Sequence, residues 1–246
     1  MDPIIVELRQ ELEERADAQA RESLQRFFKE PVQCYGVRVP VVSRIARDAW
    51  KKVSSRNKQE IFLLCEELYA SHYTEEAFIV SNWVPRMKER FTEDDFTLFA
   101  YWIRTYISNW ATCDSFCNHA VGDFVRKYPT FVDELKQWTG SENRWVRRAA
   151  AVSLIVPAKH GEFLSDVLNI ADLLLTDEDD MVQKGFGWLL KEASRKHQAE
   201  IFAYVMKNRR IMPRTSLRYA IELMPKDLKI KAMAKDIPMT QIKKKE

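Results

Sequence analysis

Trp110 and Asp114 are the two residues whose types and spacing point most directly to chemistry. They stand four residues apart in a segment of helical pattern, so the ring and the carboxylate share one helix face, which continues through Cys117 and Val121. A carboxylate among apolar positions is compensated by an arginine or a helix N-terminus, or it serves in catalysis. A helix cap is the more frequent use of such an Asp, and a lone Trp is more often part of a core.

A second pattern places Trp188 within a row of cations. The row has helical spacing and consists of Lys184, Trp188, Lys191 and Arg195, while the opposite face is apolar. Aromatic rings interleaved with cations are how proteins follow a nucleic-acid backbone. Gly185 and Gly187 in the same helix indicate close backbone approach, so we expect a surface contact here. The alternative is that Trp188 packs against a neighbouring helix.

A third pattern gathers Arg144, Arg147 and Arg148 within about one helical turn, opposite an apolar row that begins at Trp145. Three neighbouring guanidinium groups repel one another unless phosphates or carboxylates neutralise them. The guanidinium fork suits phosphate because it can donate two hydrogen bonds. The alternative is a solvated face with scattered salt bridges.

These patterns lie in a chain that we expect to be all-α. It has 246 residues, 46% of them hydrophobic and only 6 of them glycine, and apolar residues recur at helical spacing almost throughout. The helical patterns run over residues 3–17, 18–29, 41–52, 58–70, 75–89, 93–107, 110–127, 130–138, 143–156, 163–175, 179–195, 198–209 and 213–224. The one strand-like segment, 35–39, ends before Pro40.

The short connections predict antiparallel helix pairs stacked in series, each pair taking about 40 residues, as in a HEAT-like α-solenoid. Such a stack has a concave groove, and an irregular helical bundle is the alternative architecture. No linker divides the chain, so we expect residues 1–246 to form a single domain, with a flexible Lys-rich tail from about 238 to 246.

Composition excludes several classes of function. The 4 cysteines include no CxxC pair and the 4 histidines no HxxxH pair, which argues against a disulfide framework or a metal site. We expect reduced, mostly buried thiols and no metal or organic cofactor. The N-terminus offers no apolar run long enough for a signal peptide or membrane span, so we expect a cytoplasmic protein. A net charge of +3 is only a mild indication of a polyanionic partner.

Four sequence segments together resemble the AlkD family of bacterial DNA alkylation repair glycosylases. They are YGVRVP (35–40), NWATCD (109–114), RWVRRAAA (144–151) and VQKGFGWLLKE (182–192), and they follow one another in that family's order over nearly the whole chain. The resemblance implies a HEAT-like α-solenoid whose concave basic groove holds duplex DNA. It also implies a monomer that excises positively charged N3- and N7-alkylpurines, such as 3-methyladenine and 7-methylguanine, without flipping the base into a pocket. Bulkier adducts are an open alternative as substrates.

Carried over by position, the resemblance implies roles for single residues. Trp110 and Trp188 flank the deoxyribose of the lesion, Asp114 faces its anomeric carbon, and Arg148 holds the adjacent phosphate. The further DNA contacts that we expect are Arg147, Lys184, Lys191, Arg195, Arg38 and Arg44. Two positions depart from the family pattern: Lys191 stands where an arginine is expected, and Arg38 where a glutamine is.

The chemistry fits this assignment, because an alkylated purine is already cationic and leaves without a general acid, unlike the leaving group in two-carboxylate glycosidases. One carboxylate suffices to stabilise an oxocarbenium-like transition state. The rival hypothesis is a non-catalytic DNA-binding or protein-interaction scaffold on the same fold. Asp114 argues against that rival, since an anion weakens a groove meant for phosphates.

Overall fold

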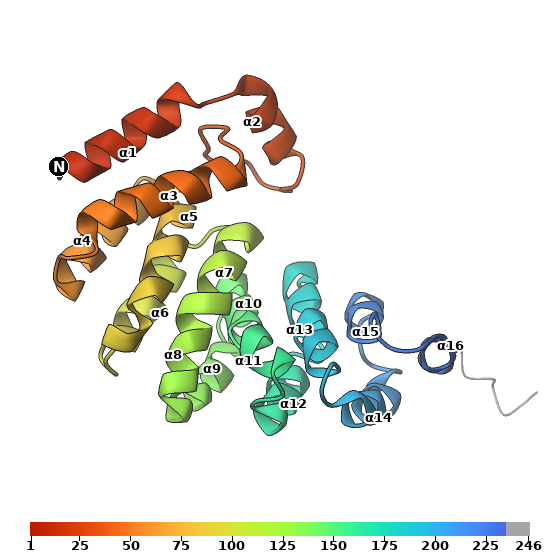
Figure 1. The fold of residues 1–246 in the computed structure, drawn as a ribbon. Coiled ribbons are helices and arrows are strands. Elements are labelled where there is room, and N and C mark those ends of the chain that lie inside the picture. The colour runs from red at the N-terminus through yellow and green to blue at the C-terminus, as the bar shows by residue number, and fades with distance from the viewer. Residues whose placement is uncertain (235–246) are drawn as a thin grey trace, which may run out of the picture.

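The computed structural model describes residues 1–234, and in that range the chain forms helices and turns without a β-strand. Figure 1 shows the helices following one another along a single bent row, from α1 and α2 at one end to α15 and α16 at the other. The expectation of an all-α protein is confirmed. The expected tail at 238–246 lies outside the described residues.

The α-helices are α1 (Pro3–Glu14), α2 (Ala18–Gln25), α3 (Val39–Val53), α4 (Lys58–Ala70), α5 (Thr74–Trp83), α6 (Asp95–Thr105), α7 (Trp110–Phe116), α8 (Gly122–Lys127), α9 (Val132–Trp138), α10 (Arg144–Val152), α11 (Ile155–Lys159), α12 (Leu164–Leu173), α13 (Asp180–Ala193), α14 (Gln198–Asn208), α15 (Arg214–Ala220) and α16 (Lys226–Met233). Two 3₁₀ helices, η1 (Val84–Arg90) and η3 (Pro129–Phe131), and one π-helix, η2 (Cys117–Val121), complete the order. Sequence reasoning missed α16.

Three helices that carry the sequence motifs each begin at a capping side chain. Asn109 accepts a hydrogen bond from the backbone N–H of Thr112 before α7, and Asn143 accepts one from Trp145 before α10. Asp179 accepts two from the first turn of α13. A side-chain oxygen at this position satisfies a backbone donor that the helix leaves unpaired. These caps fix where each motif starts and therefore which way its side chains face.

Helix α13 lies between α10 and α15, and its two glycines make this packing possible. A Cβ on Gly187 would lie 2.8 Å from Cβ of Tyr219 and 2.9 Å from Cα of Ser216, both on α15. A Cβ on Gly185 would lie 3.3 Å from Cγ of Arg148 on α10. The close approach predicted for these glycines is confirmed, but the expectation that it serves an external surface is wrong, because both contacts are internal.

The predicted helix 110–127 is interrupted. It consists of α7, one π-helical turn (η2) and α8, so one extra residue enters the turn that follows Asp114. The predicted helices 75–89 and 143–156 also divide, the first into α5 and η1 and the second into α10 and α11. The pattern of apolar residues is similar in these helix types, so periodicity alone did not reveal the breaks.

The strand-like segment 35–39 forms no strand. The backbone N–H groups of Tyr35, Gly36 and Val37 donate to the carboxylate of Glu75 at 3.1, 2.8 and 3.0 Å. Glu75 is only 1% exposed, so these bonds replace the ladder that a strand would need. Gly36 has φ +92°, and a Cβ there would collide with the backbone oxygen of Asp17.

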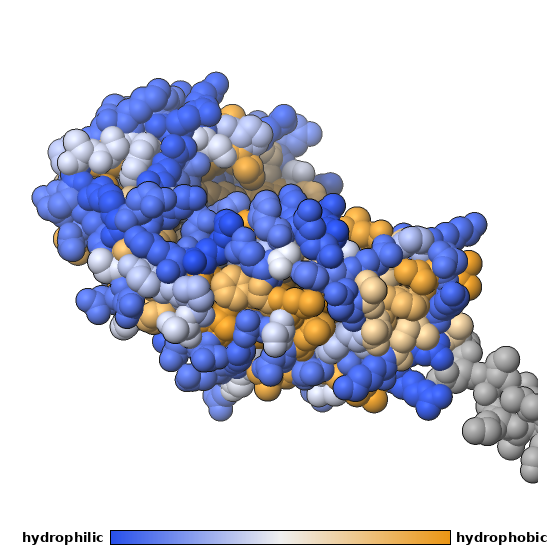
Figure 2. Space-filling view, turned by 60° about the horizontal axis from the view of Figure 1, so that its bottom comes forward, coloured by the Kyte–Doolittle hydropathy of each residue, from blue (hydrophilic) through white to orange (hydrophobic). Residues whose placement is uncertain are grey.

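All four cysteines, Cys34, Cys65, Cys113 and Cys117, are buried free thiols. Within residues 1–234, no helix is both long enough and apolar enough to cross a membrane. Figure 2 shows hydrophobic residues gathered along the middle and the C-terminal part of one face. Large apolar side chains exposed on the C-terminal helices and their turns include Ile211, Leu223 and Ile230.

Candidate active site

A cavity of about 380 Å³ brings the three motifs together. Helix α7 contributes Trp110 and Asp114, α10 contributes Arg148, and α13 contributes Lys184 and Trp188. Phe27, Met181 and Tyr219 complete the lining. The three residues expected to act on the substrate, Trp110, Asp114 and Trp188, therefore surround one space although up to 78 positions separate them in the chain.

A second cavity, of about 500 Å³, adjoins the first and shares four of its lining residues: Phe27, Trp110, Asp114 and Trp188. Its other walls are mainly apolar, and the polar groups that it adds come from the turn after Asp114. They are Ser115, Asn118 and His119. Asp114 thus lies where the two cavities meet.

Asp114 forms a buried two-pronged ion pair with Arg148. Nε of Arg148 donates to Oδ1 and Nη2 donates to Oδ2, both at 2.8 Å. The two side chains are 14% and 6% exposed. Burial raises the pKa of Asp114 above its ordinary value, while the hydrogen bonds from Arg148 oppose that rise. The site therefore presents a desolvated carboxylate whose charge depends on its arginine.

Arg148 is fully engaged within the protein. Besides its bonds to Asp114, its Nη1 donates to the backbone oxygen of Met181. The absence of a side chain at Gly185 leaves room for this guanidinium. Arg148 would have to exchange one of these partners to grip a phosphate, so its predicted DNA contact stays a prediction.

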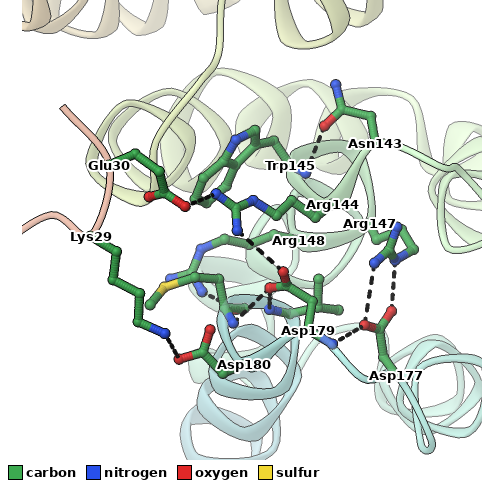
Figure 3. A network of polar contacts seen from close by, with 12 residues as sticks. Lys29, Glu30, Asn143, Arg144, Trp145, Arg147, Arg148, Asp177, Asp179 and Asp180 are labelled. Atoms are coloured by element: carbon green, nitrogen blue, oxygen red, sulfur yellow. Dashed lines mark hydrogen bonds and ion pairs between the residues drawn. The ribbon is translucent and has the colours of Figure 1, made fainter. Parts of the chain in front are cut away.

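Carboxylates neutralise the neighbouring arginines as well (Figure 3). Arg144 pairs with Glu30 at 2.5 Å and with Asp179 at 3.4 Å, and Arg147 pairs with Asp177 at 2.6 Å. The arginine cluster of α10 is therefore balanced by protein carboxylates, which is the salt-bridge alternative. A DNA contact through Arg147 stays a prediction.

Residues 27–30, which we call the strap, connect the end of α2 to the site. Phe28 stacks on Trp110 with ring centroids 5.5 Å apart, and Nε1 of Trp110 donates to the backbone oxygen of Phe27 at 3.3 Å. Lys29 pairs with Asp180 at 2.8 Å, and Glu30 holds Arg144 (Figure 3). The strap thus reaches α7, α10 and α13.

Sequence reasoning missed the strap because it assigned these residues to a helix over 18–29, whereas α2 ends at Gln25. The available signal was an aromatic pair beside an acid–base pair, just before Pro31. Phe27 lines both cavities although it is 69% exposed. It adds an open aromatic face to those of Trp110 and Trp188.

The basic row of α13 divides into two parts. Lys184 and Trp188 line the first cavity, and Trp188 also packs against the core, so both interpretations of this tryptophan hold in part. Lys191 pairs with Glu222 at 2.7 Å, and Arg195 pairs with Glu192 at 2.5 Å. Neither Lys191 nor Arg195 lines either of the two cavities around Asp114.

Arg38 and Arg44 are exposed at the start of α3 and within it. Neither forms a hydrogen bond or ion pair with another residue of the described range 1–234. Arg38 lines a separate cavity of about 610 Å³ beneath α2. These two predicted DNA contacts are therefore free to meet an anion, and they lie apart from Asp114.

The face shared by Trp110 and Asp114 does not continue as predicted. Cys117 and Val121 are fully buried in the core, so their assignment to the site face is wrong. The π-helical turn brings Asn118 to the cavity instead. Its wider turn changes which side chains follow Asp114, and helical periodicity of 3.6 residues does not anticipate it.

A model of the DNA alkylation repair enzyme family matches residues 8–224. The chain belongs to this family. The matched range contains all four segments that pointed to an AlkD-like protein, as well as the two cavities around Asp114. A comparison with curated proteins gives no match.

Solved structures show the same AlkD-like fold. A predicted DNA alkylation repair enzyme from Enterococcus faecalis superposes with a TM-score of 0.77 at 16% identity, covering 86% of this chain and 98% of its own. AlkD2 from Streptococcus mutans gives 0.57 at 18% identity, covering 83% of this chain and 97% of its own.

The alkylpurine DNA glycosylase AlkC from Pseudomonas fluorescens, bound to DNA containing an abasic site analog, gives a TM-score of 0.54 at 14% identity. The likeness covers 93% of this chain and 66% of that chain. At such identities the superpositions establish the fold of this family member, and its site must be argued from its own residues.

Proposed function

We propose that this chain is a DNA glycosylase that hydrolyses the N-glycosidic bond of positively charged N3- and N7-alkylpurines in duplex DNA. The observation that supports this most strongly is the carboxylate of Asp114, buried between Trp110 and Trp188 beside an open cavity. The bent row of helices acts as a HEAT-like solenoid whose concave face receives the duplex. The base is not flipped into a pocket.

Asp114 acts on the sugar. As the bond between C1′ and the purine nitrogen stretches, the cationic base takes both electrons and leaves neutral, while positive charge develops on the deoxyribose. A desolvated carboxylate stabilises that charge far more strongly than one in water. The faces of Trp110 and Trp188 favour a cationic sugar over a neutral one. These groups bind the transition state better than the ground state, which is what accelerates the reaction.

Arg148 has two roles in this proposal. Its fork opposes the effect of burial on Asp114, so the carboxylate can remain charged at neutral pH. On DNA binding, one of its donors exchanges to the phosphate beside the lesion. Lys184 meets the same region of backbone as a point charge at the cavity wall.

The remaining cations bind the duplex on either side of the lesion. Arg38 and Arg44 are available without rearrangement, because they have no partner in the described structure. Arg147, Lys191 and Arg195 exchange protein carboxylates for phosphates. The structural relative AlkC is bound to DNA containing an abasic site analog, which supports DNA as the partner here. The reaction requires no metal or organic cofactor, since the leaving group is already activated.

The test is release of free 7-methylguanine and 3-methyladenine from alkylated duplex DNA by the purified protein, followed chromatographically. We expect release by the wild type and a loss of at least about a hundredfold in Asp114→Asn. Gln137→Ala, on the exposed surface of α9, is the control and should retain wild-type release. Absence of release from both lesions would refute this substrate class.

A non-catalytic scaffold is the second candidate, and one observation favours it: the fork of Arg148 engages both oxygens of Asp114, as in a structural ion pair. A scaffold would bind DNA with salt sensitivity and release no base. The Asp114→Asn variant separates the two functions, because a scaffold has no turnover to lose.

A further inference from the structure

Asn118 is the least satisfied polar group at the site. It stands four residues after Asp114 on the π-helical turn and lines the 500 Å³ cavity together with Trp110, Asp114 and Trp188. Its side chain is buried, with 8% of the residue exposed, yet its Oδ1 has no hydrogen-bond partner within residues 1–234. Buried amides are nearly always hydrogen-bonded, so this one calls for a ligand.

The turn that carries Asn118 is itself unusual. The hydrogen-bonded ladder of α7 widens to π geometry directly after Phe116 and returns to α geometry at Gly122. Such single π-turns are frequent at functional sites, because the inserted residue reorients a side chain. Here the turn places the fully buried Cys117 in the core and Asn118 at the cavity, one turn from Asp114.

We propose that Asn118 positions the water molecule that attacks C1′ of the lesion. This inference rests on the proposed glycosylase function. Both oxygens of Asp114 already accept a bond from Arg148, so Asp114 alone would hold a water through one remaining contact and leave its orientation free. A second contact from Asn118 fixes the water oxygen toward the sugar.

Atoms and electrons balance in this step. The bond between C1′ and the purine nitrogen breaks with both electrons going to the base, which leaves neutral. The water oxygen forms the new bond to C1′, and its proton passes to the carboxylate of Asp114 and then to solvent. Asn118 changes neither charge nor bonding during the reaction. An amide offers an acceptor and a donor, and water can meet either one.

The test compares Asn118→Ala with Asn208→Ala under single-turnover conditions, with enzyme in excess over duplex DNA containing 7-methylguanine. Asn208 is a matched control, because it too is 8% exposed and has a buried amide nitrogen without a partner, but it lies on α14 and lines neither cavity around Asp114. We expect Asn118→Ala to slow base release by about tenfold or more, with unchanged affinity for DNA. Asn208→Ala should keep the wild-type rate.

A second readout identifies the water. In buffer containing methanol, the sugar is captured either by water or by methanol, and the two products are separated and counted. A positioned water keeps methanol capture low in the wild type. We expect the methanol share to rise in Asn118→Ala and to fall partly back in Asn118→Ser, whose hydroxyl can both donate and accept.

Each outcome decides between the hypotheses. Base release by the wild type, with a wild-type rate or an unchanged methanol share in Asn118→Ala, would overturn the role of Asn118 and leave the glycosylase standing. A slow rate that Asn118→Ser does not improve, together with a lowered melting temperature, would make Asn118 structural and also overturn it. Absence of base release by the wild type would remove the proposed function and this inference with it.

Discussion

Arg148 holds both carboxylate oxygens of Asp114 at 2.8 Å, and its third donor group binds the backbone of α13 at Met181. One arginine therefore links the three helices that line the cavity: α7, α10 and α13. The pair makes the charge of the carboxylate and the geometry of the groove depend on the same side chain. Substitutions at either end should separate catalysis from binding.

Asp114→Asn should abolish base release and preserve DNA binding, because it removes an anion from a groove that receives phosphates. We expect the dissociation constant for duplex DNA to stay the same or to decrease, as measured by fluorescence anisotropy. Asparagine satisfies Arg148 less well than aspartate, so the free energy of unfolding should fall by about 1–3 kcal/mol. Weakened binding with unchanged turnover would contradict the assignment of Asp114 to catalysis.

Arg148→Ala should move the acid limb of the pH–rate profile to higher pH. Burial raises the pKa of Asp114 and Arg148 opposes the rise, so removing the arginine raises this pKa further. The reaction uses the charged carboxylate, which then persists only at higher pH. The measurement is the single-turnover rate across pH, with Arg147→Ala as the control. An acid limb at the same pH in Arg148→Ala and the wild type would mean that the arginine does not set the charge of Asp114.

Arg148→Ala should also weaken DNA association and flatten its salt dependence. Each phosphate contact contributes about 0.9 to the slope of log affinity against log salt for duplex DNA. We therefore expect the slope to shrink by about one when binding is measured over a series of salt concentrations. A slope equal to that of the wild type would remove Arg148 from the phosphate contacts and leave it as the partner of Asp114 alone.

The sequence alone predicted the residues that meet at the cavity better than it predicted their partners. Trp110, Asp114 and Trp188 stood on recognisable helix faces with capping residues ahead of them, so their side-chain directions followed from helical periodicity. The bidentate bond between Arg148 and Asp114 joins residues 34 positions apart, and no local pattern specifies such a pairing.

Two further features escaped prediction for physical reasons. The π-helical turn at Asn118 has the same apolar residues as an α-helix would, so its altered register does not appear in the hydrophobic pattern. The buried Glu75 reads as a first-turn acid of α5, yet it holds the segment 35–37 through three backbone bonds. Its role depends on tertiary packing that the sequence does not display.

Glu30→Gln should strengthen DNA binding by releasing Arg144, which the strap otherwise occupies. One more free arginine should make the salt slope steeper by about one. The Glu30 side chain is about half exposed, so stability should change by no more than about 1 kcal/mol. The control is Glu11→Gln, which breaks the exposed pair between Glu11 and Arg15 on α1. Equal effects of both variants on binding would indicate a general charge effect and would exclude a specific role for the strap.

Gly187→Ala should destabilise the protein, because helix α15 leaves no room for a methyl group at this position. The added Cβ would lie 2.8 Å from Cβ of Tyr219 and 2.9 Å from backbone atoms of Ser216, so the two helices must separate. Overpacking of this kind costs about 1–3 kcal/mol, and the better helix propensity of alanine returns at most about 1 kcal/mol. We expect a lower denaturation midpoint in urea.

Gly140→Ala is the matched control for this substitution, since the nearest neighbouring atom to its added Cβ would lie 3.7 Å away. That variant should unfold at the wild-type urea concentration or slightly above it. Tyr219 lines the first cavity, so separation of α13 and α15 in Gly187→Ala should also displace one wall of the site and lower base release. Unchanged stability in Gly187→Ala would show that α15 yields readily, and the packing against α13 would then not fix the position of Trp188.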